Sequence, residues 1–136
     1  MKSCTVFGAL AASLVLVWVV PAFAQADLAA GRIVFNQKCA SCHTMASDPA
    51  HGPKGPNLMG VIGRTAGTLA GWDFSPALRA SGVVWTEENL NKWLTDPDVF
   101  VPGAQMPLKV PDRFEREDVI AYIRSVKAVT EGSDRK

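Results

Sequence analysis

The sequence contains few residues that bind metals through nitrogen or sulfur. Among 136 residues there are three cysteines and two histidines. Three of these five residues lie together in the segment Cys39–His43, and the other two are Cys4 and His51. A structural zinc site needs four such ligands, usually as two recognisable pairs. The scarcity of cysteine and histidine therefore argues against a structural zinc site.

An excess of one charge is also missing. The chain has 14 lysines and arginines against 13 aspartates and glutamates, a formal net charge of +1. Domains that bind nucleic acids usually carry a strongly basic patch or stripe. The balance of charge gives no support to that class of protein, so we expect no nucleic-acid partner.

Long apolar runs are absent except at the N-terminus. A short, positively charged start, residues 1–3, precedes the apolar stretch 6–20, and residues 21–24 end in an A-x-A cleavage site. This pattern is typical of a secretory signal peptide, so we expect residues 1–24 to be removed. A retained membrane anchor is the alternative, but the run is short, because a spanning helix needs about 20 apolar residues.

Removal of residues 1–24 changes the cysteine and charge counts. Cys4 leaves with the segment, and so does Lys2, after which the basic residues equal the 13 acidic residues in number. The remaining residues, 25–136, have the length of one domain. We expect this domain to be exported to the periplasm as a soluble protein, without membrane insertion.

The segment Cys39-Ala40-Ser41-Cys42-His43 is the most informative motif. Two cysteines three positions apart, with a histidine directly after the second, form the pattern for covalent attachment of a c-type haem. Each thiol can add to one vinyl group of the porphyrin, and the imidazole of His43 can bind the iron. The same thiols are then unavailable for a disulfide. A Cys-x-x-Cys redox pair is the other interpretation, but it needs a βαβ context that the sequence does not show.

Helical periodicity and turn residues predict an all-α domain with long loops. Asp27 and Thr86 are suitable N-caps, and Asp96-Pro97 is a suitable helix end. A loop as long as 44–71 is uncommon in a compact domain unless it has a task, and wrapping a cofactor is such a task. The expected helices cover about 28–38, 75–80, the segment that begins at Thr86 and 113–129; the loops are 44–71 and 99–112, and residues 131–136 form a frayed polar tail.

Haem iron bound to His43 needs a second axial ligand, whose identity sets the chemistry. Met106 is the best candidate, because it lies far enough along the chain to reach the opposite face of the porphyrin. It also lies in a stiff turn between Pro102 and Pro107. The other candidates are less suitable: Met45 is too near His43, Met59 follows a stretch expected beside His43, and His51 is expected to be a solvated surface histidine.

Three motifs occur in the order seen in class I c-type cytochromes: Cys39–His43, then Gly55-Pro56-Asn57-Leu58, then Pro102-Gly103-Ala104-Gln105-Met106. The chain resembles bacterial relatives of mitochondrial cytochrome c, of the cytochrome c2 kind, over about residues 31–126. The resemblance implies the class I cytochrome c fold, in which three to five helices and long loops surround one haem c held through Cys39 and Cys42. It also implies His43 and Met106 as the iron ligands.

The resemblance implies further contacts. The Pro56 carbonyl would accept a hydrogen bond from the His43 ring, and Arg64 and Trp85 would contact the inner haem propionate. Ordinary core packing is the alternative for Trp85. Gly31 and Phe35 would pack near Tyr122. The sequence departs from the family at four pocket positions, where tyrosine, asparagine, tyrosine and threonine are frequent: Phe74, Leu78, Trp93 and Ala104. The resemblance implies that Trp93 lies near the methionine ligand.

These expectations describe an electron-transfer protein and not an enzyme. It would be a monomeric, periplasmic single-electron carrier whose His/Met-ligated haem cycles between Fe(II) and Fe(III) in a respiratory or photosynthetic chain. Its transient partner could be an oxidase, a reductase, a reaction centre or a periplasmic dehydrogenase. Four lysines could contribute to docking: Lys38, Lys54, Lys92 and Lys109. The alternatives are a peroxidase-like enzyme or gas sensor with a labile methionine ligand, and a dedicated cytochrome subunit of one dehydrogenase.

Overall fold

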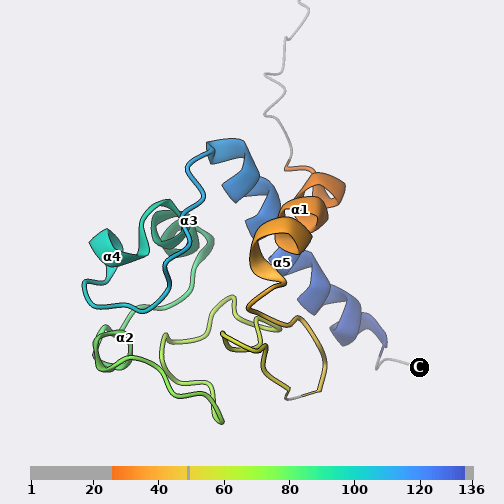
Figure 1. The fold of residues 1–136 in the computed structure, drawn as a ribbon. Coiled ribbons are helices and arrows are strands. Elements are labelled where there is room, and N and C mark those ends of the chain that lie inside the picture. Colours follow the sequence, from red (N-terminus) through yellow and green to blue (C-terminus); the bar gives the residue numbers. More distant parts are fainter. Residues whose placement is uncertain (1–25, 49, 134–136) are drawn as a thin grey trace, which may run out of the picture.

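The computed structural model describes residues 26–48 and 50–133, so the expected signal peptide and its cleavage site lie outside the described residues. Within these ranges the regular structure is helical, apart from one isolated bridge between Thr65 and Val84. The prediction of an all-α fold is confirmed. The elements, drawn in Figure 1, are α1 (Leu28–Val34), the π-helical turn η1 (Phe35–Cys39), α2 (Pro76–Ala80), α3 (Glu87–Thr95), α4 (Pro97–Phe100) and α5 (Arg113–Ser133).

The first helix begins at the predicted cap and ends differently from the prediction. The Asp27 carboxylate accepts hydrogen bonds from the backbone N–H groups of Ala29 and Ala30, which lack partners inside the helix. After Val34 the α-helix widens into η1, and the Ala40 N–H donates to the Phe35 carbonyl at 2.9 Å. This wider turn carries Cys39 to a buried position. The π turn was not predicted, because hydrophobic spacing does not distinguish it from one more α-helical turn.

The N-terminal and C-terminal helices cross in close contact, as the resemblance implied (Figure 1). Gly31 is buried at the crossing, where a Cβ atom would overlap the Asp118 carbonyl oxygen and lie 2.8 Å from Cβ of Tyr122. One turn later, the rings of Phe35 and Tyr122 lie 5.7 Å apart. Glycine therefore lets the two backbones approach, and this approach holds the segment that leads to Cys39 against α5.

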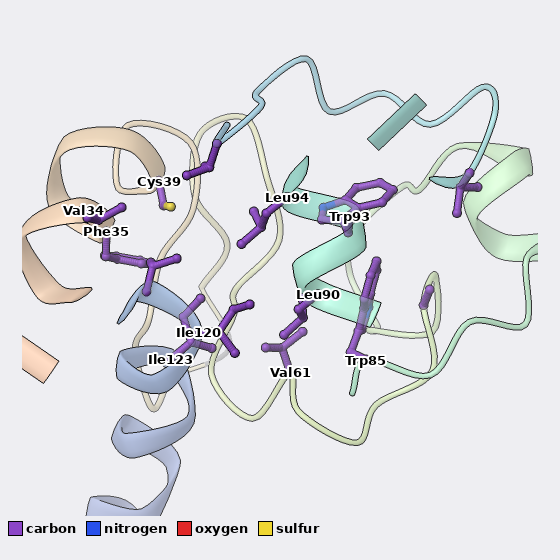
Figure 2. Packing of buried hydrophobic residues seen from close by; sticks show 14 of the residues in the cluster. Val34, Phe35, Cys39, Val61, Trp85, Leu90, Trp93, Leu94, Ile120 and Ile123 are labelled. Carbon is purple, nitrogen blue, oxygen red and sulfur yellow. The ribbon is translucent and has the colours of Figure 1, made fainter. Parts of the chain in front are cut away.

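Helix α3 forms the side of the core that faces the α1–α5 pair. Thr86 caps it through the Asn89 N–H, and its buried side chains are Leu90, Trp93 and Leu94. Figure 2 shows Leu90 and Leu94 extending from α3 toward Ile120 and Ile123 of α5 in the same cluster. The apolar stripe at helical spacing therefore forms the buried face that the sequence predicted.

The remaining helices agree with the prediction only in part. Ser75 caps α2, whose first residue is Pro76, so the short helix expected at 75–80 is confirmed within one residue. The loop expected from residue 99 contains the end of α4, a single turn that is too short to show periodicity. Helix α5 continues to Ser133, so the segment 131–133 is helical and not a frayed tail.

The close crossing predicts that Gly31→Ala destabilises the protein. Alanine favours helix by about 1 kcal/mol over glycine, so any net loss of stability on this substitution must come from the contact with α5. Overpacking of this kind costs roughly 1–3 kcal/mol, and we expect a lower urea midpoint in the haem-loaded protein. Ala29→Ser, on an exposed site of the same helix, is the control and should change stability by less than about 0.5 kcal/mol. An unchanged midpoint for Gly31→Ala would show that the contact does not constrain the helices.

Candidate haem site

A cavity of 530 Å³ lies between the two parts of the core, within the range of about 300–1,000 Å³ typical of small-molecule sites. Its wall is mainly apolar and is drawn from segments that are distant in the sequence: η1, the loop 41–75, α2, α3, the segment 105–108 and α5. All seven predicted site residues line this one cavity: Cys39, Cys42, His43, Pro56, Arg64, Trp85 and Met106.

The turn after η1 places both thiols of the motif on the cavity wall. The N–H groups of Cys42 and His43 both donate to the Cys39 carbonyl, at 3.0 and 2.9 Å. Burial raises the pKa of the Cys39 thiol to about 11, which the neighbouring positive charge of Lys38 partly opposes. The Cys39 thiol is therefore uncharged at neutral pH. No group of three or more His, Cys, Asp or Glu side chains is placed to hold a metal ion in the described ranges.

The His43 ring is oriented by a backbone carbonyl. Its Nδ1 lies 2.8 Å from the Pro56 oxygen. Because a carbonyl can only accept, Nδ1 carries the proton and donates it, which leaves the lone pair of Nε2 free for a metal. Burial lowers the pKa of His43, and the hydrogen bond to Pro56 opposes this only in part. The neutral imidazole that iron requires is therefore the form that the fold favours.

Two glycines of the loop allow this packing. A Cβ atom at Gly55 would lie 2.6 Å from Nδ1 of His43, and one at Gly52 would lie 2.7 Å from the Cys42 carbonyl carbon. Both residues are buried. The sequence indicated only that this stretch is a loop; that it packs directly on the motif depends on long-range contacts.

His51 is not the solvated surface histidine that was expected. It is half-buried: its Nδ1 accepts the Asn57 N–H at 3.2 Å, and its Nε2 donates to the Ala70 carbonyl at 3.1 Å. Its ring also meets Trp72 edge-on, with 5.5 Å between centroids. His51 therefore joins two parts of the long loop. It does not line the cavity.

Met106 lies on the cavity wall, and its sulfur has a polar partner. The indole Nε1–H of Trp93 donates to Met106 Sδ at 3.2 Å. Of the other described methionines, Met45 and Met59 do not line the cavity. The resemblance implied that Trp93 lies near the methionine ligand, but the hydrogen bond itself was not predicted, because the two residues lie on different segments.

Arg64 provides a positive charge at the cavity. It is half-buried, its guanidinium donates to the carbonyls of Asn57 and Met59, and burial lowers its pKa. None of the ion pairs formed by the described residues involves Arg64. The backbone N–H of Trp85 donates to the Arg64 carbonyl at 2.9 Å, which holds the two residues together. An anionic group on a ligand would find a counter-charge here.

The residues present fit a covalently bound haem c. The cavity combines two thiols, a neutral imidazole with its iron-binding nitrogen free, a thioether and a cation on an otherwise apolar wall. Three of the four positions that depart from the family also line the cavity, Phe74, Leu78 and Trp93, and the first two make the wall more apolar. An imidazole nitrogen and a thioether sulfur are both known axial ligands of haem iron.

Because burial lowers the pKa of His43 in the folded state, protonation of this residue favours unfolding. The stabilisation is complete above the ordinary imidazole pKa of about 6.5 and is lost as the pH falls through and below that value. Iron bound at Nε2 would also require the neutral His43 ring, so we expect the urea midpoint of the haem-loaded protein to fall as the pH drops below the ordinary imidazole pKa. The visible spectrum and far-ultraviolet circular dichroism should change together in acid. Release of His43 from iron while the helices remain folded would contradict this coupling.

Comparisons with known proteins agree with this site. The sequence profile described as Cytochrome c matches residues 28–127. The chain is 45% identical over 100 residues to cytochrome c 2.1 of Caenorhabditis briggsae, covering 71% of this chain and 86% of that protein. It is 39% identical to cytochrome c of Guizotia abyssinica, covering 75% and 92% of the two chains.

A solved structure gives the same result. Cytochrome cH from Methylobacterium extorquens superimposes with a TM-score of 0.66 at 39% identity, covering 73% of this chain and 98% of that one. The fold is thus that of the class I cytochromes c, and Cys39 and Cys42 occupy the positions of the family's haem-attachment motif. The profile match, the sequence relatives and the shared fold together show that this chain belongs to the cytochrome c family.

Proposed function

We propose that this chain is a periplasmic single-electron carrier whose haem c, attached at Cys39 and Cys42, has His43 and Met106 as its iron ligands. Proteins of the cytochrome c family are electron carriers and not enzymes, and they bind haem c covalently. The observation that carries the ligand assignment is that the His43 imidazole and the Met106 thioether line the cavity that also contains both thiols.

When bound, haem c supplies an iron that exchanges one electron between Fe(II) and Fe(III). The residues of the chain set the conditions for this exchange. Pro56 holds the His43 ring with Nε2 free, and thioether ligation by Met106 favours the ferrous state relative to two nitrogen ligands. Two protein ligands would leave no open position for a substrate. Arg64 would neutralise part of the charge of a propionate at the wall.

The lysines proposed for docking are largely paired with carboxylates. Lys38 contacts Glu115, Lys92 contacts Glu88 at 2.7 Å and Lys109 contacts Asp96 at 2.6 Å. Redox partners are a property of the family, and the particular partner is a proposal: an oxidase, reductase, reaction centre or periplasmic dehydrogenase, met transiently by a monomer. Because these ion pairs reduce the local positive charge, we expect electrostatic steering of the encounter to be weak.

The periplasmic location rests on the N-terminal sequence. Residues 1–24 have the charged start, apolar run and cleavage site of a secretory signal. Among the described residues, no helix has the length and apolar character needed to span a membrane. Covalent haem attachment through Cys39 and Cys42, with Cys4 removed, would leave the mature protein without a free thiol.

The ligand assignment predicts the spectrum of the protein and of Met106→Ala. Wild-type ferric protein should show the weak methionine–iron band at the red end of the visible spectrum, and wild-type ferrous protein should not bind carbon monoxide. Met106→Ala should lose the band and bind carbon monoxide, because it opens one axial position. Met59→Ala, which changes a methionine away from the cavity, is the matched control and should retain both wild-type properties. Carbon monoxide binding by wild type would instead support an open site, as in a sensor or peroxidase.

The attachment and export proposals together predict the number of thiols in the denatured, purified protein. We expect no reaction with a thiol reagent, since Cys39 and Cys42 form thioethers and Cys4 has left with the signal. The intact mass should equal that of residues 25–136 plus one haem. One reactive thiol at the mass of residues 1–136 plus one haem would show that the N-terminal segment is retained, whereas any reactive thiol at the mass of residues 25–136 would show incomplete attachment. Only the latter outcome would contradict the haem site itself.

A further inference from the structure

The segment that carries Met106 has few bonds to the rest of the protein. It leaves α4, runs past α3 and reaches the start of α5 without regular structure of its own (Figure 1). Within the described ranges, no backbone hydrogen bond joins residues 105–109 to another part of the chain. Segments with few backbone hydrogen bonds open more readily than the helices around them. The position of the Met106 sulfur therefore depends on side-chain contacts and on the two ends of the segment.

Both ends of the segment meet at the end of α3. The Val110 N–H donates to the Leu94 carbonyl at 2.7 Å, and the Val110 carbonyl accepts a hydrogen bond from the buried guanidinium of Arg116 at 2.8 Å. At the other end, Asp96 lies directly between α3 and α4. Residues 96–109 therefore form a loop that leaves α3 and returns to it.

One ion pair closes this loop. The ammonium of Lys109 donates to Oδ2 of Asp96 at 2.6 Å, so the last residue of the loop contacts the first. The positive charge of Lys109 holds the pKa of the Asp96 carboxyl below its ordinary value, and the carboxylate is charged at neutral pH. Among the polar side-chain contacts of residues 105–109, the structure shows only this ion pair and the hydrogen bond between Trp93 and Met106.

We propose that Asp96 and Lys109 are positioning residues that hold the Met106 segment closed at the haem site, and so limit how often the sulfur leaves the iron. This inference rests on the proposed function, because it requires Met106 to be an iron ligand. An open segment would admit an external ligand to the iron. The ion pair therefore favours the closed electron carrier over a site with a labile methionine, and it gives Lys109 a task other than docking.

The exposure of the two side chains limits the size of the effect. The side chain of Lys109 is 55% exposed and that of Asp96 is 28% exposed. Because ion pairs near the surface are weak, loss of this one should change the population of open segments by only about twofold to fivefold. The interaction between two partly exposed charges should also weaken as salt is added.

The experiment measures the rate at which imidazole replaces Met106 in the ferric, haem-loaded protein. At saturating imidazole the opening of the segment limits this rate, and loss of the methionine–iron band reports it. K109Q removes the ammonium, D96N removes the charge of the carboxylate, and D96N/K109Q completes the double-mutant cycle. K109R restores a cation at the same position.

K92Q is the matched control. Lys92 also forms an ion pair, with Glu88 at 2.7 Å, and its side chain is 54% exposed, almost the same fraction as that of Lys109. It lies on α3, outside the loop and outside the wall of the cavity. The control therefore removes one positive charge and one surface ion pair without changing the closure of the segment.

We expect K109Q and D96N each to raise the rate by about twofold to fivefold. The double variant should exceed neither single variant, because all three lack the same contact. K109R should stay near the wild-type rate, and K92Q should match it. Added salt should accelerate the exchange in wild type but not in K109Q. A purely structural role for Lys109 would lower the urea midpoint of the whole domain without accelerating the exchange.

The outcomes separate this inference from the proposed function. If wild type lacks the methionine–iron band, the ligand assignment fails and the inference fails with it. If wild type has the band but K109Q exchanges at the wild-type rate, the inference is overturned and the carrier function stands. The same holds if K92Q accelerates the exchange as much as K109Q, if K109R gives no rescue, or if the effects of D96N and K109Q add, because a general change of charge or packing would then explain the result.

Discussion

A large cavity at the centre of a small domain is the constraint on which the rest of this structure depends. Several core residues face the cavity as well as one another, among them Leu78, Trp85, Leu90, Leu94 and Ile123. A domain of this size buries only part of its apolar surface, so a covalently held cofactor would complete the core as well as provide the chemistry. The close α1–α5 crossing and the capped helix α3 then serve to hold the two sides of the cavity in place.

The two proposed axial ligands are each supported by a second contact of different chemistry. On one side, the Pro56 carbonyl fixes the tautomer of His43 and leaves Nε2 available. On the other, the indole of Trp93 donates to the sulfur of Met106. Supporting contacts of this kind orient ligands and tune a metal site. The apolar residues Phe74 and Leu78 leave these contacts among the few polar ones at the cavity, which increases their influence.

Much of the fold and site was predictable because it is encoded over short distances in the sequence. The Cys39–His43 motif, the caps Asp27 and Thr86, and the apolar stripes of α3 and α5 each need only neighbouring residues to be recognised. The features that were missed depend on tertiary contacts or on very short elements. The π turn before Cys39, the single turn α4, the burial of His51 against Trp72 and the Trp93–Met106 hydrogen bond are of this kind. The two side-chain contacts join segments whose mutual position is decided by packing, and the two turns are too short for their pattern to be recognised.

The most direct test of this account is X-ray absorption spectroscopy at the iron edge of the purified haem-loaded protein, in both oxidation states. The fine structure reports which atoms surround the iron. We expect five nitrogen neighbours and one sulfur neighbour in the ferric and ferrous proteins alike: four nitrogens from the porphyrin, one from His43 and the sulfur of Met106. A first shell without sulfur, or one that loses sulfur on reduction, would contradict the assignment of Met106 and with it the two-ligand electron carrier.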